Sequence, residues 1–585
     1  MQGVGAAGWA FAAANAQMGF AQAGGASANG SILSLNCNSG TPIPSRGRSL
    51  MKFSFNFPEP CVAFEGLQIG FRVFTFENVY APDEKRITVE QRPNGLEIRC
   101  SQLVWAGGQQ TAPGTITAHL VKNGDTIELR AEAQMEQRVK TLAVVVRGVP
   151  KGRISGGGGN FDDSRNNEVL LGYPFSAGDL NYAGGLTTPL VMIEQGPSQF
   201  FYLSAEDTHV RATRFYFQPC DDAYRVELIT EGDGWVKSDR LESPVWRLGK
   251  APSVEAAARP HFTRLEKTYS IPDWETRPDV PKWMRGVSLV AALHGMHYTG
   301  YVFNTFPKML TMLEWMAGKI DPHRVLVFLP AWDGRYYWDY PDYRVSERLG
   351  GDTAFRRLID RGHSLGFRFM PMYGTNAANR GLASYSKIAD AATSKIDGDH
   401  MDLNWVDWDN DRHHEGWLSY MSLGVDSYRR WMFDRIDDMI SRYHVDAYFL
   451  DIVGGWTNNP AADMHAGVRR LVQDLRAKHP EVMAAGEMHY DALLEFIPLF
   501  QVFATAGYPP GMQKYVRNFY HLSHPAPGRG STGVHESGFG RWNPQTLSMG
   551  GRIVIPTLTV VDDTFDKYRD QMQAVVEAAA KWTPG

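Results

Sequence analysis

From Trp283 onward the sequence alternates between short apolar runs and longer amphipathic stretches. The runs that read as strands lie at 285–293, 323–332, 367–374, 445–453 and 481–490. Stretches with helical periodicity separate them, at 306–319, 352–366, 425–444 and 463–479. Near-continuous apolar strands between helices indicate a parallel sheet that is covered on both faces. About 280 residues of this pattern favour a (β/α)8 TIM barrel over an open doubly wound sheet. No G-x-G-x-x-G follows the first strand, which disfavours a dinucleotide-binding fold.

The preceding part of the chain has a different pattern. Short alternating runs such as LQIGFRVFTF and DTIELRAEA are separated by Asn, Gly, Pro and Asp, which is typical of antiparallel strands. We expect a multidomain chain with an irregular segment at 1–48, an all-β sandwich at 49–270, a Pro-rich linker at 271–282 and a catalytic α/β barrel at 283–585.

Composition excludes several classes of function. The net charge is −5 with 59 basic and 64 acidic residues, and no basic stripe is present for a nucleic-acid partner. No apolar run is long enough to span a membrane, and no signal peptide is evident in this chain. The four cysteines show no C-x-x-C spacing, and we expect free buried thiols, although a disulfide remains open. Localisation and oligomeric state are not determined by these features.

The active site of such a barrel is built at the carboxyl ends of its strands. Polar and aromatic residues that follow the predicted strands are therefore the candidate site residues: His294, Trp332, Asp333, Tyr337, Tyr373, Asn376, Asp451, Trp456, Glu487, His489 and Tyr490.

Asp451 and Glu487 are the candidate catalytic residues. Each follows a buried apolar strand, where a carboxylate is costly unless it faces a polar site. They are 36 residues apart in the sequence, which corresponds to one strand–helix unit. Cleavage of a glycosidic bond needs one carboxylate at the anomeric carbon and one acid for the leaving oxygen. A helix N-cap or a salt bridge at the barrel rim is the structural alternative for each residue. Gly486 removes a side chain next to Glu487, and we expect this to leave room for a ligand.

The segments VDAYFLD and AAGEMHY, which contain these two residues, resemble the fourth- and fifth-strand signatures of the α-amylase-like glycosidase barrels. The order of a β-sandwich and then a barrel also resembles α-galactosidases and endo-α-N-acetylgalactosaminidases. The resemblance implies an α-linked substrate, Asp451 as nucleophile and Glu487 as acid/base. Phe449 stands where the amylase pattern has Arg, and the late VVDDTFD lacks a preceding His. These departures favour a more distant family with the same type of barrel.

The loop AWDGRYYWDYPDY is unusually aromatic, and we expect exposed rings, Trp332 foremost, to form a platform for the sugar. Packing of this loop against the barrel is the alternative. We expect Asp333 to accept hydrogen bonds from sugar hydroxyls. The aspartates of NWVDWDNDRHHEGW resemble a calcium loop, but the glycine and glutamate of an EF-hand are missing. The loop GVHESGFGRW is either part of the site or an ordinary surface loop.

The sequence therefore predicts a glycoside hydrolase, with retention favoured and no cofactor or metal expected. The expected partner is an oligosaccharide or glycoside, with no nucleic acid and no membrane. An inverting glycosidase with the same residue pair and a non-catalytic carbohydrate-binding barrel are the alternatives. A metal-dependent hydrolase that uses His294 and His297 is a further one.

Overall fold

The computed structural model describes residues 40–45, 48–53, 59–105, 108–174, 185–220, 222–297, 300–335, 337–396, 398, 401–402, 418–502, 510–520, 554–561 and 564–584. The chain divides into two compact units, and the main boundary between them falls between Tyr269 and Ser270. Each unit is described separately below. Among the described residues, no helix combines the length and apolar character required to cross a membrane.

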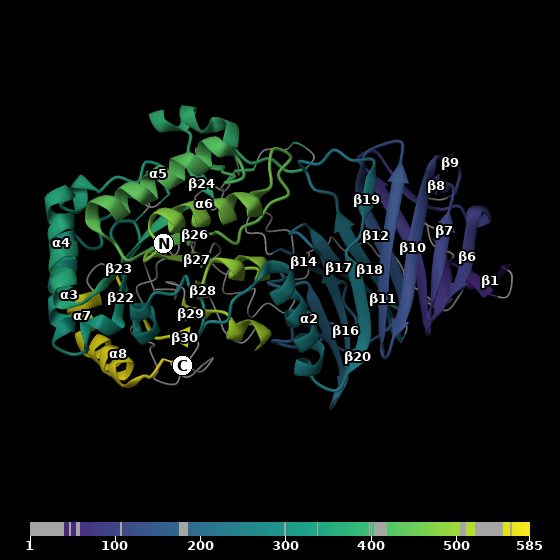
Figure 1. Ribbon diagram of the computed structural model, residues 1–585, viewed down its shortest axis with the longest axis horizontal. Helices are drawn as coiled ribbons and strands as arrows, with labels where there is room; N and C mark the ends of the chain where they lie inside the picture. Colours follow the sequence, from purple (N-terminus) through teal and green to yellow (C-terminus); the bar gives the residue numbers. More distant parts are fainter. Residues whose placement is uncertain are drawn as a thin grey trace, which may run out of the picture. The chain divides into compact units, whose positions relative to one another are not determined.

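The first unit consists of two antiparallel sheets (Figure 1). The larger has the order β1 (Gly40–Ser45), β2 (Arg48–Phe53), β3 (Pro60–Phe64), β4 (Leu67–Thr75), β12 (Val139–Pro150), β18 (Ala223–Glu231), β17 (Thr213–Pro219) and β14 (Val169–Tyr173), with β5 (Val79–Pro82), β8 (Leu103–Trp105) and β9 (Thr111–Ala112) beside it. The second has the order β13 (Arg153–Gly156), β15 (Leu190–Gly196), β16 (Gln199–Glu206), β20 (Val245–Ala251), β11 (Thr126–Met135), β10 (Gly114–Asn123), β7 (Gly95–Cys100) and β6 (Ile87–Arg92), with β19 (Arg240–Glu242) beside β11.

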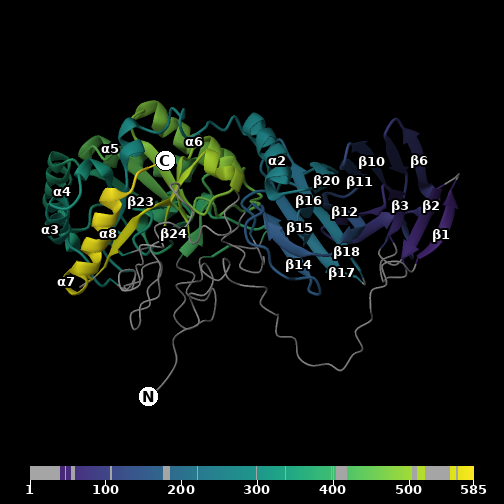
Figure 2. The ribbon, with the colours of Figure 1, turned by 90° about the horizontal axis from the view of Figure 1, so that it is seen from below.

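Buried and exposed side chains alternate along the strands, and this alternation explains how the two sheets form a core. In β11 every second side chain from Ile127 to Met135 is buried, as expected for a strand with one face toward a core. Phe215 of β17 meets Trp246 of β20 edge to face, with 5.5 Å between ring centroids, so the two sheets share a core contact. Helix α2 (Val254–Tyr269) lies against β16 and β20 (Figure 2). Cys61 and Cys100 are free and buried, whereas Cys220 is disulfide-bonded.

The second unit contains one parallel sheet and its surrounding helices. The strand order is β30 (Val554–Ile555), β29 (Arg517–Tyr520), β28 (Leu499–Val502), β27 (Met483–Glu487), β26 (Ala447–Asp451), β23 (Arg368–Gly374), β22 (Val325–Leu329), β21 (Leu289–Leu293) and β31 (Thr557–Val560). The helices are α3 (Phe306–Ala317), α4 (Gly351–Leu365), α5 (Asp426–Tyr443), α6 (Met464–Lys478), α7 (Thr564–Lys567) and α8 (Arg569–Lys581), and β24 (Ala377–Asn379) pairs with β25 (Leu418–Tyr420). In both views the helices lie outside the parallel strands (Figures 1 and 2).

The described part of this sheet has nine strands where we expected eight. The two strands at the ends of the order, β30 and β31, are separated in the chain only by Pro556. Proline has no N–H for a strand ladder, but the Pro556 carbonyl accepts a hydrogen bond from Val290 of β21. The sheet is therefore a nearly closed barrel. Phe328, Phe449 and Phe519 fill its interior, with ring centroids 4.7 to 5.9 Å apart.

The predicted helices and strand ends agree closely with the structure. Helix α4 ends at Gly366, whose φ of +110° is readily adopted only by glycine, and its N–H bonds the carbonyls of Gly362 and His363. Helix α5 covers Asp426–Tyr443 within the predicted 425–444. In the segment expected as a linker, Arg277 is 1% exposed and donates to the carbonyls of Leu494 and Tyr515, so this segment packs on the barrel unit.

Candidate active site

Asp451 and Glu487 are the last residues of the neighbouring strands β26 and β27. Leu450 pairs with Gly486 in the parallel register, so the two acidic residues come next to each other at the carboxyl end of the barrel. Each is 3% exposed, and their carboxyl groups are hydrogen-bonded to each other. One of the two must carry a proton for that bond to form.

The two carboxyl groups differ in their other partners. Tyr337 Oη donates a hydrogen bond of 2.6 Å to Asp451 Oδ2. The backbone N–H of Ile452 donates to Glu487 Oε2 over 3.2 Å. Burial raises the pKa of Glu487, while its bonds with Asp451 and Ile452 oppose that shift. Each acid therefore receives one hydrogen bond from the protein, and a donor stabilises the charged form of its acceptor, whereas burial favours the neutral form.

The backbone around the pair has an uncommon conformation. Ile452 and Met488, which directly follow the two acids, have φ of 51° and 53°, and Tyr337 has φ of 64°. Left-handed geometry is unfavourable for non-glycine residues, especially a β-branched one, and such strain clusters at functional sites. The two loops are also interlocked, because a Cβ atom on Gly454 would lie 1.2 Å from the carbonyl oxygen of Met488. The positions of both acids are thus set by their main chain.

Gly486 does not have the role that the sequence suggested. We expected its missing side chain to leave room for a ligand beside Glu487. In the structure a Cβ atom there would lie 2.5 Å from Val453 Cγ1 and 3.3 Å from the ring of Phe500. The space is filled by Val453, so the glycine serves internal packing.

Asp333, after β22, is a buried carboxyl group in an unusual state. It is 7% exposed, and in the described part of the chain neither carboxyl oxygen has a hydrogen-bond partner apart from its own backbone N–H. Burial raises its pKa well above the ordinary value, and the nearby Asp339 and Asp342 add to the shift. A buried polar group without partners is costly, so its retention suggests that a ligand completes its hydrogen bonds.

We expect Asp333→Asn to raise the melting temperature at pH 7. A carboxyl group with a raised folded-state pKa contributes full stability below its unfolded pKa and loses it as the pH rises toward the folded value. The stabilisation by Asn should therefore grow by about 1.4 kcal/mol per pH unit between those two pKa values. Thermal unfolding at pH 5 and pH 7 tests this, with Asp360→Asn on the exposed side of α4 as control. An equal change at both pH values would contradict the buried, protonated state.

Gln501 is a candidate site residue that sequence reasoning missed. It is paired with Glu487 in the register of β27 and β28 and is 2% exposed. Its Nε2 has no hydrogen-bond partner among the residues that the structure describes. The sequence did contain a signal for Gln501, because it is the one polar residue in the apolar run LFQVF. An amide in such a run is costly to bury without a hydrogen-bond partner.

Other predicted residues supply further polar groups. Tyr373 is fully buried with no partner for its hydroxyl among the described residues, and Trp456 Nε1 is in the same state. Asn376 is fully buried beside Tyr420. His489 packs on Phe500 at 5.0 Å, and burial lowers its pKa to about 4, so its ring is neutral near pH 7.

The expectation of an exposed aromatic platform is wrong for Trp332, Tyr337 and Tyr340, which are all buried. Trp332 is 1% exposed, its Nε1 donates to the Met372 carbonyl over 3.0 Å, and its ring contacts Phe355 of α4. Tyr340 is fully buried as well. The hydroxyl of Tyr490 also has a hydrogen-bond partner within the protein, because it lies 2.9 Å from His465 Nδ1 of α6. Aromatic content alone did not distinguish a sugar platform from inward packing.

His294 is also buried, and burial together with His297 lowers its pKa to about 3. Within the described ranges, no three His, Cys, Asp or Glu side chains form a group that could hold a metal ion. The two histidines therefore have no third ligand in that part of the molecule. The structure does not describe the aspartate-rich loop at 404–417, the glycine-rich loop at 533–542, Tyr336, Asp562 or Asp563.

No protein-family model and no curated protein sequence matches this chain. Its fold is similar to solved structures of glycoside hydrolases. The α-N-acetylgalactosaminidase NagBb from Bifidobacterium bifidum, in complex with GalNAc, has 12% identity and a TM-score of 0.63, with 92% of this chain and 93% of that chain covered. A GH31 family sulfoquinovosidase from E. rectale has 12% identity and a TM-score of 0.54, with 89% and 81% covered. An α-galactosidase from Lactobacillus brevis has 11% identity and a TM-score of 0.50, with 87% and 72% covered.

Proposed function

We propose that this chain is a retaining glycoside hydrolase that cleaves an α-linked sugar, with Asp451 as nucleophile and Glu487 as acid/base. The observation that carries the proposal is the hydrogen-bonded pair of buried carboxyl groups at adjacent strand ends of the barrel. The likeness of the fold to an α-N-acetylgalactosaminidase and an α-galactosidase supports the choice of an α-linkage.

The proposed domain arrangement follows from this fold. We count β30 and β31 as one eighth strand interrupted at Pro556, which makes residues 283–585 a (β/α)8 catalytic barrel. The Phe215–Trp246 contact supports a sandwich of the two antiparallel sheets within residues 49–270.

In the proposed reaction Asp451 attacks the anomeric carbon while Glu487 protonates the leaving oxygen. Tyr337 keeps the nucleophile ionised and aimed by donating to Oδ2. Thr375 Oγ1, which donates to the Asp451 carbonyl over 2.7 Å, holds the main chain at this point. A bound sugar separates the two carboxyl groups, and the deprotonated Glu487 then activates water against the glycosyl–Asp451 ester.

Substrate binding falls to the buried polar groups that lack partners in the described structure. We assign sugar hydroxyls to Asp333, Tyr373 and Gln501, each of which has hydrogen-bonding capacity to offer. Trp456, Asn376 and His489 are proposed to complete the site. We propose that Trp332 and Tyr490 support the site without binding the sugar, because their polar atoms are already hydrogen-bonded to other residues of the protein.

Inversion is the less favoured mechanism. It needs about 6.5–9.5 Å between the carboxyl groups to admit a water molecule. The neighbouring positions of Asp451 and Glu487 at the ends of the paired strands β26 and β27 favour the shorter spacing of a retaining enzyme.

Activity against nitrophenyl α- and β-glycosides of N-acetylgalactosamine, galactose and glucose tests the proposal. We expect turnover of at least one α-glycoside and none of the β-glycosides. The double variant Asp451→Asn/Glu487→Gln should be inactive while its melting temperature stays near that of the parent. A folded parent chain that cleaves no α-glycoside, or a double variant that is equally active, would refute the assignment and favour a binding-only barrel or another chemistry.

We expect Tyr337→Phe to lower kcat about 10- to 100-fold, as loss of a hydrogen bond to a charged group does. The loss should appear in kcat more than in KM, because the phenol bonds the nucleophile. Steady-state kinetics measure both constants. Tyr385→Phe is the control, since that hydroxyl bonds Ser419 and not a catalytic carboxyl group. A kcat equal to that of the parent would argue against the positioning role of Tyr337.

A further inference from the structure

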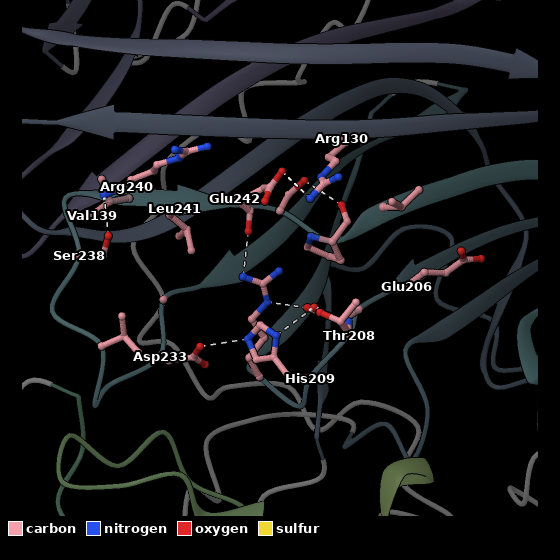
Figure 3. A pocket seen from close by; sticks show the side chains of 17 residues that line it. Arg130, Val139, Glu206, Thr208, His209, Asp233, Ser238, Arg240, Leu241 and Glu242 are labelled. Atoms are coloured by element: carbon pink, nitrogen blue, oxygen red, sulfur yellow. Dashed lines mark hydrogen bonds and ion pairs between the residues drawn. The ribbon is translucent and has the colours of Figure 1, made fainter. Parts of the chain in front are cut away.

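The antiparallel-sheet unit contains a cavity of about 380 Å³ (Figure 3). Its walls come from the segment that follows β16, the segment 232–245 around β19, and the strands β11 and β12. Its volume is within the range of about 300–1,000 Å³ that is typical of small-molecule sites. The barrel residues proposed above take no part in it.

A network of charged side chains fixes the shape of this cavity. His209 Nε2 lies 3.0 Å from Asp233 Oδ2, and its Nδ1 lies 3.4 Å from Asp207 Oδ1. Arg211 donates to Asp207 and to the Glu242 carbonyl, and Arg130 forms an ion pair with Glu242. Figure 3 shows His209 and Asp233 pointing toward each other across the cavity wall. The polar groups are therefore positioned before any ligand arrives.

The charges of the lining balance, which restricts the class of ligand. Within the lining, Arg211 pairs with Asp207 and Arg130 pairs with Glu242. Glu206 and Arg240 pair with residues outside the lining, namely Arg247, Arg264 and Glu132. His209 lies 3.0 Å from Asp233, and this bond raises the pKa of the imidazole. The charged groups of the lining therefore already have partners of opposite charge or a hydrogen-bonded imidazole. A phosphate would need an excess of positive charge, and a cation an excess of carboxylates. Within the described residues no acidic and histidine side chains are grouped as a metal site.

The lining also offers what a neutral polyhydroxylated ligand requires. Asp233 Oδ1 has no hydrogen-bond partner in the described structure, and the side chain as a whole is 14% exposed, so the carboxylate keeps acceptor capacity for a hydroxyl group. Val236 is 49% exposed, and with Leu241 and Val245 it gives the cavity an apolar side. Sugars combine ring hydroxyls with apolar C–H faces, and carboxylate and guanidinium groups bind hydroxyls strongly.

We propose that this cavity is a second carbohydrate-binding site, which takes one residue of a neutral sugar and works independently of Asp451 and Glu487. The site goes beyond the proposed hydrolysis. It would hold a glycan by a unit other than the one being cleaved, and so raise the local concentration of substrate.

Equilibrium binding to the full chain tests this inference. The double variant Asp451→Asn/Glu487→Gln removes turnover, and the probes are galactose, N-acetylgalactosamine, glucose and mannose. We expect at least one probe to bind a site that Asp233→Asn weakens tenfold or more. Asp239→Asn, an exposed neighbour outside the lining, is the matched control and should leave binding unchanged.

Each outcome is decisive once melting temperatures show that the variants fold. Binding that is identical in Asp233→Asn and Asp239→Asn, or absent for all four sugars, would overturn the second site. Asp233→Asn in the otherwise unaltered chain should leave kcat/KM for an aryl glycoside unchanged. If the chain hydrolyses no glycoside but Asp233-dependent binding persists, the proposed function fails and the second site stands.

Discussion

Asp451→Ala is expected to lower kcat/KM for an α-glycoside by about 10⁴-fold or more, the scale seen when a covalent nucleophile is removed. The reason is structural, because Asp451 ends β26 in the middle of the site and receives the Tyr337 hydroxyl over 2.6 Å.

Added azide should restore part of the activity of Asp451→Ala. The small anion can occupy the space of the lost carboxylate and attack from the face opposite to the leaving group. The product from an α-glycoside should therefore be a β-glycosyl azide. Asp434→Ala, an exposed position on α5, is the control and should keep full activity without responding to azide. A fully active Asp451→Ala, or rescue that yields only the α-azide, would show that Asp451 is not the nucleophile.

Glu487→Gln is expected to have an effect that depends on the leaving group. Substrates with poor leaving groups should lose about 10²- to 10⁴-fold in rate, which is the usual contribution of a positioned acid. Activated substrates such as dinitrophenyl glycosides should lose far less in their first step, because their leaving oxygen needs little protonation. Comparing kcat/KM across a series of leaving groups measures this difference.

The pH dependence of the same enzyme gives an independent check. Burial raises the pKa of Glu487, so the parent should lose activity as the pH rises through that value. Since glutamine does not ionise, the basic limb should disappear in Glu487→Gln. The two carboxyl groups titrate as a coupled pair, so the pKa values read from the pH–rate profile belong to the pair and not to either residue alone. A basic limb that persists unchanged in the variant would assign the acid to another residue.

Much of this fold could be predicted because its determinants are local. Continuous apolar runs, the amphipathic period of α5 and the glycine that ends α4 are readable from neighbouring residues. Placing Asp451 and Glu487 side by side needed only the rule that the ends of adjacent parallel strands share one rim. The register of β26 and β27 agrees with that inference.

Features that depend on the direction of a side chain could not be predicted. Trp332 and Tyr337 lie five residues apart in one aromatic loop, yet one bonds a strand carbonyl and the other bonds Asp451. The sequence suggests that Gly486 leaves space for a ligand, but Val453 fills that space in the structure. Gln501 is conspicuous only when its register with Glu487 is known, and Pro556 conceals the continuity of β30 and β31.

Proton NMR of the first sugar product tests the central assignment most directly. An α-glycoside that the chain cleaves is mixed with enzyme, and the anomeric signal is recorded before mutarotation. A nucleophilic Asp451 with Glu487 as acid/base predicts that the α-anomer forms first, because two displacements restore the configuration. First appearance of the β-anomer would mean a single displacement by water, which would make Asp451 a general base and contradict the proposed mechanism.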